Sequence, residues 1–385
     1  MTVREKLQGL GTYPTREPVI LALLCALAVG AFLAVGGLSR AYHAQQQALA
    51  DRWFTRGTVD LKDAHFDRAV ADFRAALRYS RDSYDYQLNL AQALIGLKRT
   101  DEAYAYLINL WEREPENGLV NLELAHIAAQ KDQTEQALRY YHNAIYAIWP
   151  GDQEVQRRKT RLELIEFLLD INAKPQAQSE LIALAASLGD DPSLHQRVGD
   201  LFLHAQDYEH ALAEYRLALK SDHHDSAALA GAGLAAFGLG RYSLAQRYLQ
   251  VAVVANPEDE RSADLLKTTE LVLRMDPYQR QISADQRNRI VIEAFAAAGE
   301  RLKSCAATIT SSGAASLETL EQSLADNWAK MKPKINERDL RRDPDLAERA
   351  MDLVFEIERE SKIACGAPTG TDLALLLISK LHEGN

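Results

Sequence analysis

One small residue recurs along this chain at a nearly fixed distance, and this recurrence limits the possible folds more than any other feature. Each occurrence opens a helical segment in which apolar residues follow at positions i, i+3, i+4 and i+7. The recurring residues are Ala69, Ala103, Ala137, Ala177, Ala211 and Ala245. Their spacings are 34, 34, 40, 34 and 34 residues. Such a period is typical of stacked helix pairs, because one pair cannot bury its apolar face alone.

The residues around each marker resemble the tetratricopeptide repeat family, in which a large residue, Leu-Gly/Ala, Tyr/Phe, Ala, Phe/Tyr, Ala and Pro follow one another. The first unit fills this pattern with Trp53, Gly57, Phe66, Ala69, Phe73 and Ala76. The fifth unit fills it with Val198, Gly199, Phe202, Tyr208, Ala211, Tyr215 and Ala218. The resemblance implies an all-α fold, an α-solenoid of about six helix pairs over residues 50–275. Its expected parts are 50–83, 84–117, 118–151, 158–191, 192–225, 226–259 and a capping helix at 260–275.

Two prolines locate an irregularity in this array. Pro115 and Pro257 close the second helices of units two and six, and they lie 142 residues apart. Four periods account for 136 of these residues, so six are inserted after the third unit, near residues 152–157. We expect a lengthened turn there. In the degenerate fourth unit, Pro175 falls near the first turn of the second helix, where proline is tolerated.

Residues 18–38 contain no charged side chain. At about 1.5 Å per residue they would extend roughly 31 Å as a helix, which matches the hydrocarbon core of a bilayer. We therefore predict a retained single-pass transmembrane helix, preceded by a tail at 1–17 and followed by a linker at 39–49. A cleaved signal peptide and a buried core helix are the alternatives, although a signal core usually has only about 7–15 apolar residues.

Basic residues near the span bear on its orientation. Three lie before it (Arg4, Lys6, Arg16) and two after it (Arg40, Arg52). An excess of one favours a cytoplasmic N-terminus and an extracytoplasmic soluble part, which would be periplasmic in a bacterium. Within the span, small residues recur every fourth position at Ala22, Ala26, Gly30 and Ala34. This stripe would allow another transmembrane helix to approach, or it reflects the ordinary composition of such helices.

The resemblance implies a concave surface lined chiefly by the first helix of each pair, where proteins or peptides bind. The expected partner-binding residues are Thr58, Leu88, Asn89, Gln92, Leu122, His126, Leu162, Glu166 and Asp200. One subfamily binds a carboxylate with Lys, Asn, Asn, Lys and Arg; the matching positions here hold Phe54, Thr58, Asn89, Leu119 and Glu123. Only Asn89 agrees, so we expect no carboxylate clamp, and the ligand is not identified by these residues.

The 34-residue marker is absent beyond Pro277, and residues 278–385 read as a small helical module on the array or beside it. Predicted helices begin at the capping box Ser283–Gln286, span 316–331 with Leu317, Leu320, Leu324 and Trp328 on one face, run from Asp343 to Ile357, and cover 373–381. A break is expected at 308–316. Cys305 and Cys365 either form a disulfide or remain buried thiols. The acidic stretch 356–360 is interpreted as a solvated helix face.

Several kinds of chemistry are not indicated. The net charge of −10 disfavours nucleic-acid binding, and no P-loop, HExxH, GxSxG or EF-hand pattern occurs. The glycine-rich segment 231–240 lies inside a predicted helix without a preceding strand, so helix packing explains it better than a dinucleotide loop. Residues 222–225, Asp-His-His-Asp, fall in an inter-repeat turn, where we expect exposed polar residues rather than a metal site. We therefore expect no metal, no cofactor and no enzymatic activity.

These observations favour a membrane-anchored tetratricopeptide scaffold that binds protein or peptide partners without catalysis. A second interpretation is a fixed accessory subunit of a larger membrane complex, which would dock through the anchor stripe and the C-terminal module. A third is an enzyme with a site in residues 278–385, which the residue types there do not favour.

Overall fold

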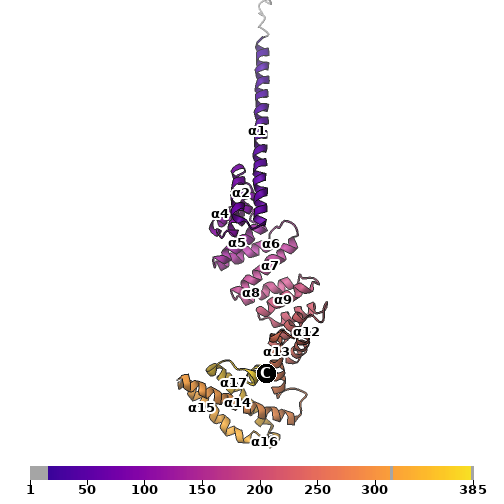
Figure 1. The fold of residues 1–385 in the computed structure, drawn as a ribbon, viewed down its shortest axis with the longest axis vertical. Helices are drawn as coiled ribbons and strands as arrows, with labels where there is room; N and C mark the ends of the chain where they lie inside the picture. Colours follow the sequence, from indigo (N-terminus) through magenta and orange to yellow (C-terminus); the bar gives the residue numbers. More distant parts are fainter. Residues whose placement is uncertain (1–15, 313–314, 383–385) are drawn as a thin grey trace, which may run out of the picture. The chain divides into compact units, whose positions relative to one another are not determined.

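The computed structural model describes residues 16–312 and 315–382, and in this part of the chain the regular elements are all helices (Figure 1). The predicted tail, apart from Arg16 and Glu17 at the start of the first helix, lies outside the described residues, and with it Arg4 and Lys6. The chain divides into two compact units, residues 1–164 and 165–385. Each unit is described by itself.

The first helix, α1, runs without interruption from Arg16 to Lys62 (Figure 1). It contains the apolar segment 18–38, which is long and apolar enough to cross a membrane. Residues 39–49, predicted as a linker, are helical as well. The physical reason is their composition: residues 39–56 contain neither glycine nor proline and are rich in Ala, Gln and Arg, which favour helix. The apolar segment and the first repeat therefore share one helix.

The rest of the first unit consists of helix pairs. The elements after α1 are α2 (Phe66–Tyr79), α3 (Tyr84–Gly96), α4 (Thr100–Arg113), α5 (Gly118–Gln130), α6 (Thr134–Tyr146) and the start of α7 (Gln153–Asp170). Asp72 on α2 forms a two-pronged ion pair with Arg56 on α1, and Ala50 and Tyr86 share a small apolar cluster with Ala76. The end of α1 is thus the first helix of the first pair.

The residues that mark the period lie where paired helices meet. All six marker alanines are fully buried: Ala69, Ala103, Ala137, Ala177, Ala211 and Ala245. Glycine on the facing helix also allows the two helices to approach closely, because a Cβ added at Gly57 would lie 2.7 Å from the Phe73 ring. In the segment 231–240, a Cβ at Gly231 would lie 2.2 Å from Tyr215 and one at Gly233 would lie 2.7 Å from Leu249. Close helix packing therefore accounts for these glycines.

The six inserted residues do not simply lengthen a turn. The loop between α6 and α7, residues 147–152, is short, and α7 has 18 residues where α3 and α5 each have 13. Most of the insertion has become the first turns of α7. The reason is local capping: the Asp152 carboxylate accepts hydrogen bonds from the backbone N–H groups of Glu154 (3.1 Å) and Val155 (3.2 Å).

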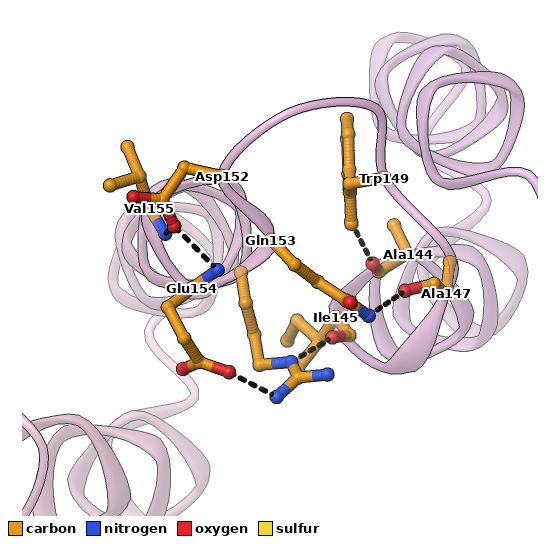
Figure 2. Close-up of polar contacts among 9 residues, drawn as sticks. Ala144, Ile145, Ala147, Trp149, Asp152, Gln153, Glu154 and Val155 are labelled. Carbon is orange, nitrogen blue, oxygen red and sulfur yellow. Dashed lines mark hydrogen bonds and ion pairs between the residues drawn. The ribbon is translucent and has the colours of Figure 1, made fainter.

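One side chain of this loop and two of α7 then bond to the end of α6 (Figure 2). Trp149 donates through Nε1 to the Ala144 carbonyl (2.8 Å), Gln153 donates to the Ala147 carbonyl (3.1 Å) and Arg157 donates to the Ile145 carbonyl (2.9 Å). These carbonyls lie at the C-terminus of α6, where helical partners run out. The insertion is therefore an ordered structure.

The second unit contains the end of α7 and the remaining pairs. These are α8 (Lys174–Ala185), α9 (Pro192–His204), α10 (Tyr208–Ala218), α11 (Ser226–Gly238) and α12 (Tyr242–Ala255), followed by α13 (Glu260–Met275) at the position of the predicted capping helix. Pro175 occupies the first turn of α8, as predicted. The all-α repeat fold inferred from the sequence is thus confirmed: six helix pairs, a further helix and a helical module.

The C-terminal module packs on the end of the array. It comprises α14 (Ala284–Ser312), α15 (Ala315–Met331), η1 (Lys332–Lys334), α16 (Glu337–Arg342), α17 (Pro344–Cys365) and α18 (Gly370–His382). Its core continues through Val272 and Met275 of α13 to Tyr242 of α12. Of the two arrangements left open by the sequence, packing on the array is the observed one.

Details of the module differ from the prediction. Helix α14 extends into the expected break and reaches Ser312, α17 continues eight residues past Ile357, and α16 was not predicted. Ser283 accepts a hydrogen bond from the Gln286 N–H, as the capping box requires (3.2 Å). Leu324 is buried and Trp328 is half-buried against the core, whereas the side chains of Leu317 and Leu320 lie outside the described ones.

A disulfide links α14 to the end of α17. Cys305 and Cys365 are bonded, with their Cα atoms 5.5 Å apart, so the bridge and not the pair of thiols is observed. Beside it, the interpretation of residues 356–360 as a solvated face is wrong for one of their three acidic side chains, because Glu358 is fully buried. The reason is its register: Met351, Val354, Glu358 and Ser361 all lie on the buried stripe of α17.

Candidate functional site

Polar side chains on the first helices of three successive pairs are joined into a row in the first unit. Gln92 on α3 donates to a Glu123 carboxylate oxygen on α5 (3.1 Å). His126, one turn further along α5, contacts Glu163 on α7 through Nε2 (2.7 Å) and lies 3.7 Å from Glu123 through Nδ1. Two of the predicted binding residues, Gln92 and His126, therefore belong to one continuous polar row.

The row contains one imidazole, that of His126, between the carboxylates of Glu123 and Glu163. Burial by itself lowers the pKa of the imidazole, but the hydrogen bonds and charges of Glu123 and Glu163 outweigh it and raise the pKa to about 9. His126 is therefore charged at neutral pH and lies between two carboxylates. Its side chain remains 36% exposed, so the row is accessible to a ligand.

The other predicted residues of the first unit have different surroundings. Thr58 and Asn89 hydrogen-bond to backbone carbonyls of their own helices, those of Thr55 and Asp85 (both 2.8 Å). The three leucines are largely buried: Leu88, Leu122 and Leu162. Leucines at these positions therefore contribute more to packing between pairs than to an open surface.

In the second unit, Glu166 forms an ion pair with Arg197 (2.8 Å), which repeats the link between successive first helices. Asp200 accepts a hydrogen bond from the buried Tyr215 hydroxyl. Burial and the Asp200 charge raise the pKa of Tyr215, so it stays a neutral donor. Because the Tyr215 ring fills the space beside Gly199 and Gly231, Asp200 supports the packing of the pairs there.

Two sequence motifs find local explanations. In residues 222–225, Asp225 caps α11 by accepting from the N–H groups of Ala227 (2.9 Å) and Ala228 (3.0 Å), and Asp222 accepts from the His224 N–H (2.9 Å). Glu123 stands where a carboxylate clamp would place arginine, and its negative charge would repel a carboxylate.

A groove of about 1010 Å³ opens beside the inserted loop in the first unit. Its walls come from the starts of α3 and α5, from the turn 114–117 and from residues 148–150. Of the predicted binding residues, only Leu88 lines it. Its other principal lining residues, Tyr84, Leu119, Ile148 and Trp149, were not predicted as ligand contacts.

The two glutamates of the polar row, Glu123 and Glu163, were not predicted as binding residues, although the repeat period could have indicated them. Glu123 and Glu163 follow Gln92 and His126 by 31 and 37 residues, close to one repeat length, so their partnership follows from the period. The groove had no such signal, because it depends on how the insertion folds back.

Comparison with known proteins supports the fold. Residues 61–127 match the family model of the tetratricopeptide repeat. No curated protein matches the chain. The matched residues lie between the end of α1 and α5, within the first three helix pairs. Proteins with this repeat generally mediate interactions with proteins or peptides.

Similar solved structures include pilF of Pseudomonas aeruginosa, which is 16% identical, with 57% of this chain and 97% of that chain covered and a TM-score of 0.40. YrrB, described as a repeat protein with an unusual peptide-binding site, is 15% identical over 50% of this chain and 95% of its own, with a TM-score of 0.39. The C-terminal part of a repeat protein from Cytophaga hutchinsonii is 14% identical over 62% of this chain and 93% of its own, with a TM-score of 0.46.

Proposed function

We propose that this chain is a membrane-anchored scaffold that binds a protein or peptide partner on the first-helix face of its repeats, without catalysis. The observation that carries the proposal is the continuity of α1, in which the apolar segment and the first helix of the array form one element. A helix that ends in the packed first repeat gives no flexible joint at residues 39–49. The binding face would therefore be held at a set distance from the membrane.

The polar row is the proposed contact surface. Gln92, Glu123, His126 and Glu163 present donors and acceptors that the array has already ordered, so a partner would meet them without a large loss of side-chain entropy. An anchored partner in the same membrane would also benefit from a raised effective concentration.

The disulfide bears on the compartment that we propose for the soluble part. Disulfides persist in oxidising compartments and are rare where thiols are kept reduced. The Cys305–Cys365 bridge therefore supports placing the soluble part on the extracytoplasmic side, in agreement with the excess of basic residues before the span. Non-reducing mass spectrometry of peptides from cells lysed with a thiol-blocking reagent would test it; finding both cysteines alkylated would contradict this placement.

Site-specific photocrosslinking tests the partner face. A photoreactive amino acid in place of Gln92 should give a discrete crosslinked product in intact membranes, and the same substitution at the exposed Glu135 on α6 serves as the control. Equal products at both positions, or none at Gln92, would contradict the proposal.

The accessory-subunit alternative makes a different prediction. A chain shortened to begin at Ala41 keeps the first repeat, because its packed residues start at Ala50. A scaffold should still bind its partner in this form. A fixed subunit that docks through its membrane helix should instead be lost from the large complex.

A further inference from the structure

The groove beside the inserted loop has an apolar side chain that is exposed and yet fixed. Ile148 is 64% exposed. Its N–H donates to the Glu116 carbonyl (2.9 Å) and its carbonyl accepts from the Gly118 N–H (3.1 Å), which forms a parallel bridge between Asn117 and Ile148. A β-branched side chain held in water by two backbone hydrogen bonds is a preformed contact point, because binding it requires little further ordering.

Trp149, next to Ile148 in the chain, lines the same groove. Its indole N–H is already bonded to the Ala144 carbonyl, and its ring lies so close to Gly118 that a Cβ there would come within 2.3 Å. Trp149 is nearly buried, so it shapes the groove while Ile148 offers the surface. Tyr146 and Val155, on either side of the loop, are also exposed, at 71% and 46%. Of these three exposed apolar side chains only Ile148 lines the groove.

The polar lining of the groove has one sign of charge. Three carboxylates line it, Asp85, Glu114 and Glu116, and no lysine, arginine or histidine does. Several other acidic side chains of the first unit have a cationic partner across the repeats, as Glu102 has Arg74 and Asp101 has Lys131. No ion pair joins the three groove carboxylates to a cation within the described chain. One cation lies beside the groove, because the Arg113 guanidinium is 5.5 Å from the centroid of the Tyr84 ring. Three carboxylates against this one cation leave an excess of negative charge around the apolar floor.

We infer that this groove binds a lysine- or arginine-bearing segment of a partner protein, with an apolar side chain of that segment seated on Ile148 and its cations at Asp85, Glu114 and Glu116. The inference rests on the proposed scaffold function and names the chemistry of one partner segment. The apolar contact supplies affinity through the area removed from water, and the rim selects the charge. Acidic segments are disfavoured because like charges would meet at the rim.

The test uses three fluorescent twelve-residue peptides and the full chain in nanodiscs of phosphatidylcholine, a lipid without net charge. The first peptide carries leucines flanked by lysines, the second carries the same leucines flanked by glutamates, and the third carries serines flanked by lysines. Fluorescence anisotropy should show the lysine–leucine peptide binding roughly tenfold or more tighter than either other peptide, and more weakly as salt is raised. Similar binding of the first two peptides would overturn the inference.

Two variants separate the contributions of charge and apolar contact. Glu114→Lys with Glu116→Lys should reverse the preference so that the glutamate–leucine peptide binds better. Ile148→Ser should weaken the lysine–leucine peptide about fivefold or more while the charge preference remains. Glu135→Lys with Glu258→Lys, two exposed positions outside the groove, is the matched control and should change neither. An unchanged preference in the groove double variant would overturn the inference.

Two further outcomes distinguish failure of the groove inference from failure of the proposed scaffold function. If the Gln92 crosslink forms equally in the wild type and in the groove variants, the scaffold function stands and the groove inference is wrong. If the full chain associates with itself and the groove double variant abolishes that association, the occupant is a second copy of this chain and the inferred partner segment is overturned.

Discussion

In the repeat array, His126 lies between two carboxylates supplied by its own and a neighbouring repeat, whereas in the C-terminal module Glu358 is fully buried and both of its carboxylate oxygens lack a hydrogen-bond partner among the described residues. Burial raises the pKa of Glu358 to about 8, the negative charge of Asp372 adds to this, and Arg301 opposes it. In the array, a charged side chain such as His126 can pair with opposite charges on its own and on the neighbouring helix pair. The module, a single core without such repetition, keeps its buried acid neutral instead.

The two regions also differ in how they resist unfolding. The array depends on contacts between neighbouring helices, so damage at one pair should stay near that pair. The module joins helices distant in sequence around one core and is bridged by a disulfide that closes 60 residues. Four predictions test this difference, from the largest expected effect to the smallest.

Removing the disulfide by Cys305→Ser with Cys365→Ser should destabilise the module by about 4 kcal/mol, because a bridge across 60 residues limits the unfolded chain. Hydrogen exchange should become faster in α14 and α17 and stay unchanged in α3–α6. Cys25→Ser, at the exposed free cysteine, is the control. Equal protection of α17 in variant and wild type would mean that the bridge does not hold the module.

Glu358 should make the module less stable as the pH rises. Between its ordinary pKa of 4.5 and about 8, the folded chain holds a proton that the unfolded chain has released, so unfolding is favoured with increasing pH. The slope is about 1.4 kcal/mol per pH unit, which gives at most about 4 kcal/mol from pH 5 to pH 8.

The variant Glu358→Gln should remove this slope, because the amide stays neutral, while Glu356→Gln at an exposed position of the same helix should retain it. Denaturant unfolding of the module, followed by hydrogen exchange at each pH, measures the effect. A wild-type stability that is constant from pH 5 to pH 8 would show that Glu358 is not a buried neutral acid.

Overpacking one helix contact should damage the array locally. Ala211 is fully buried at the meeting of α9 and α10, so Ala211→Trp should cost about 1–3 kcal/mol or more. Faster exchange should be limited to helices α8–α12, with α14 and α17 protected as before. Ala213→Trp, two residues away and exposed, should have little effect. If melting is the same for both variants, the assigned register is wrong.

His126 should give the smallest change. Its pKa in the folded chain is about 9 against an ordinary 6.5, so its contribution to stability is complete below pH 6.5 and is lost as the pH rises through 9. Because the side chain is 36% exposed, solvent screening keeps this contribution below about 1 kcal/mol. His126→Gln should remove the pH dependence in this window, measured by thermal unfolding; a retained dependence would assign it to another group.

Most of the array could be predicted from the sequence, because its helices are specified by contacts that repeat every 34 residues. Ala69 and Ala211 are both small because each lies where two paired helices meet. Pro175 is tolerated because it lies in the first turn of α8, where the backbone N–H needs no helical partner. The candidate site could be predicted only in part. Gln92 and His126, which were predicted from their place on the first helices, lie in the observed polar row. Leu88 and Leu122, predicted on the same face, are largely buried.

The sequence by itself determined the number of helix pairs, their small-residue contacts and the apolar segment, since each of these depends on neighbours along the chain or one period away. Only the tertiary structure decided that α1 is continuous, that the insertion lengthens α7 and leaves Ile148 exposed on an acidic groove, and that Glu358 lies inside the module. These features depend on which distant groups meet, such as Arg157 with the end of α6 and α17 with α14. Pairings of this kind are set by packing in three dimensions, which local patterns do not specify.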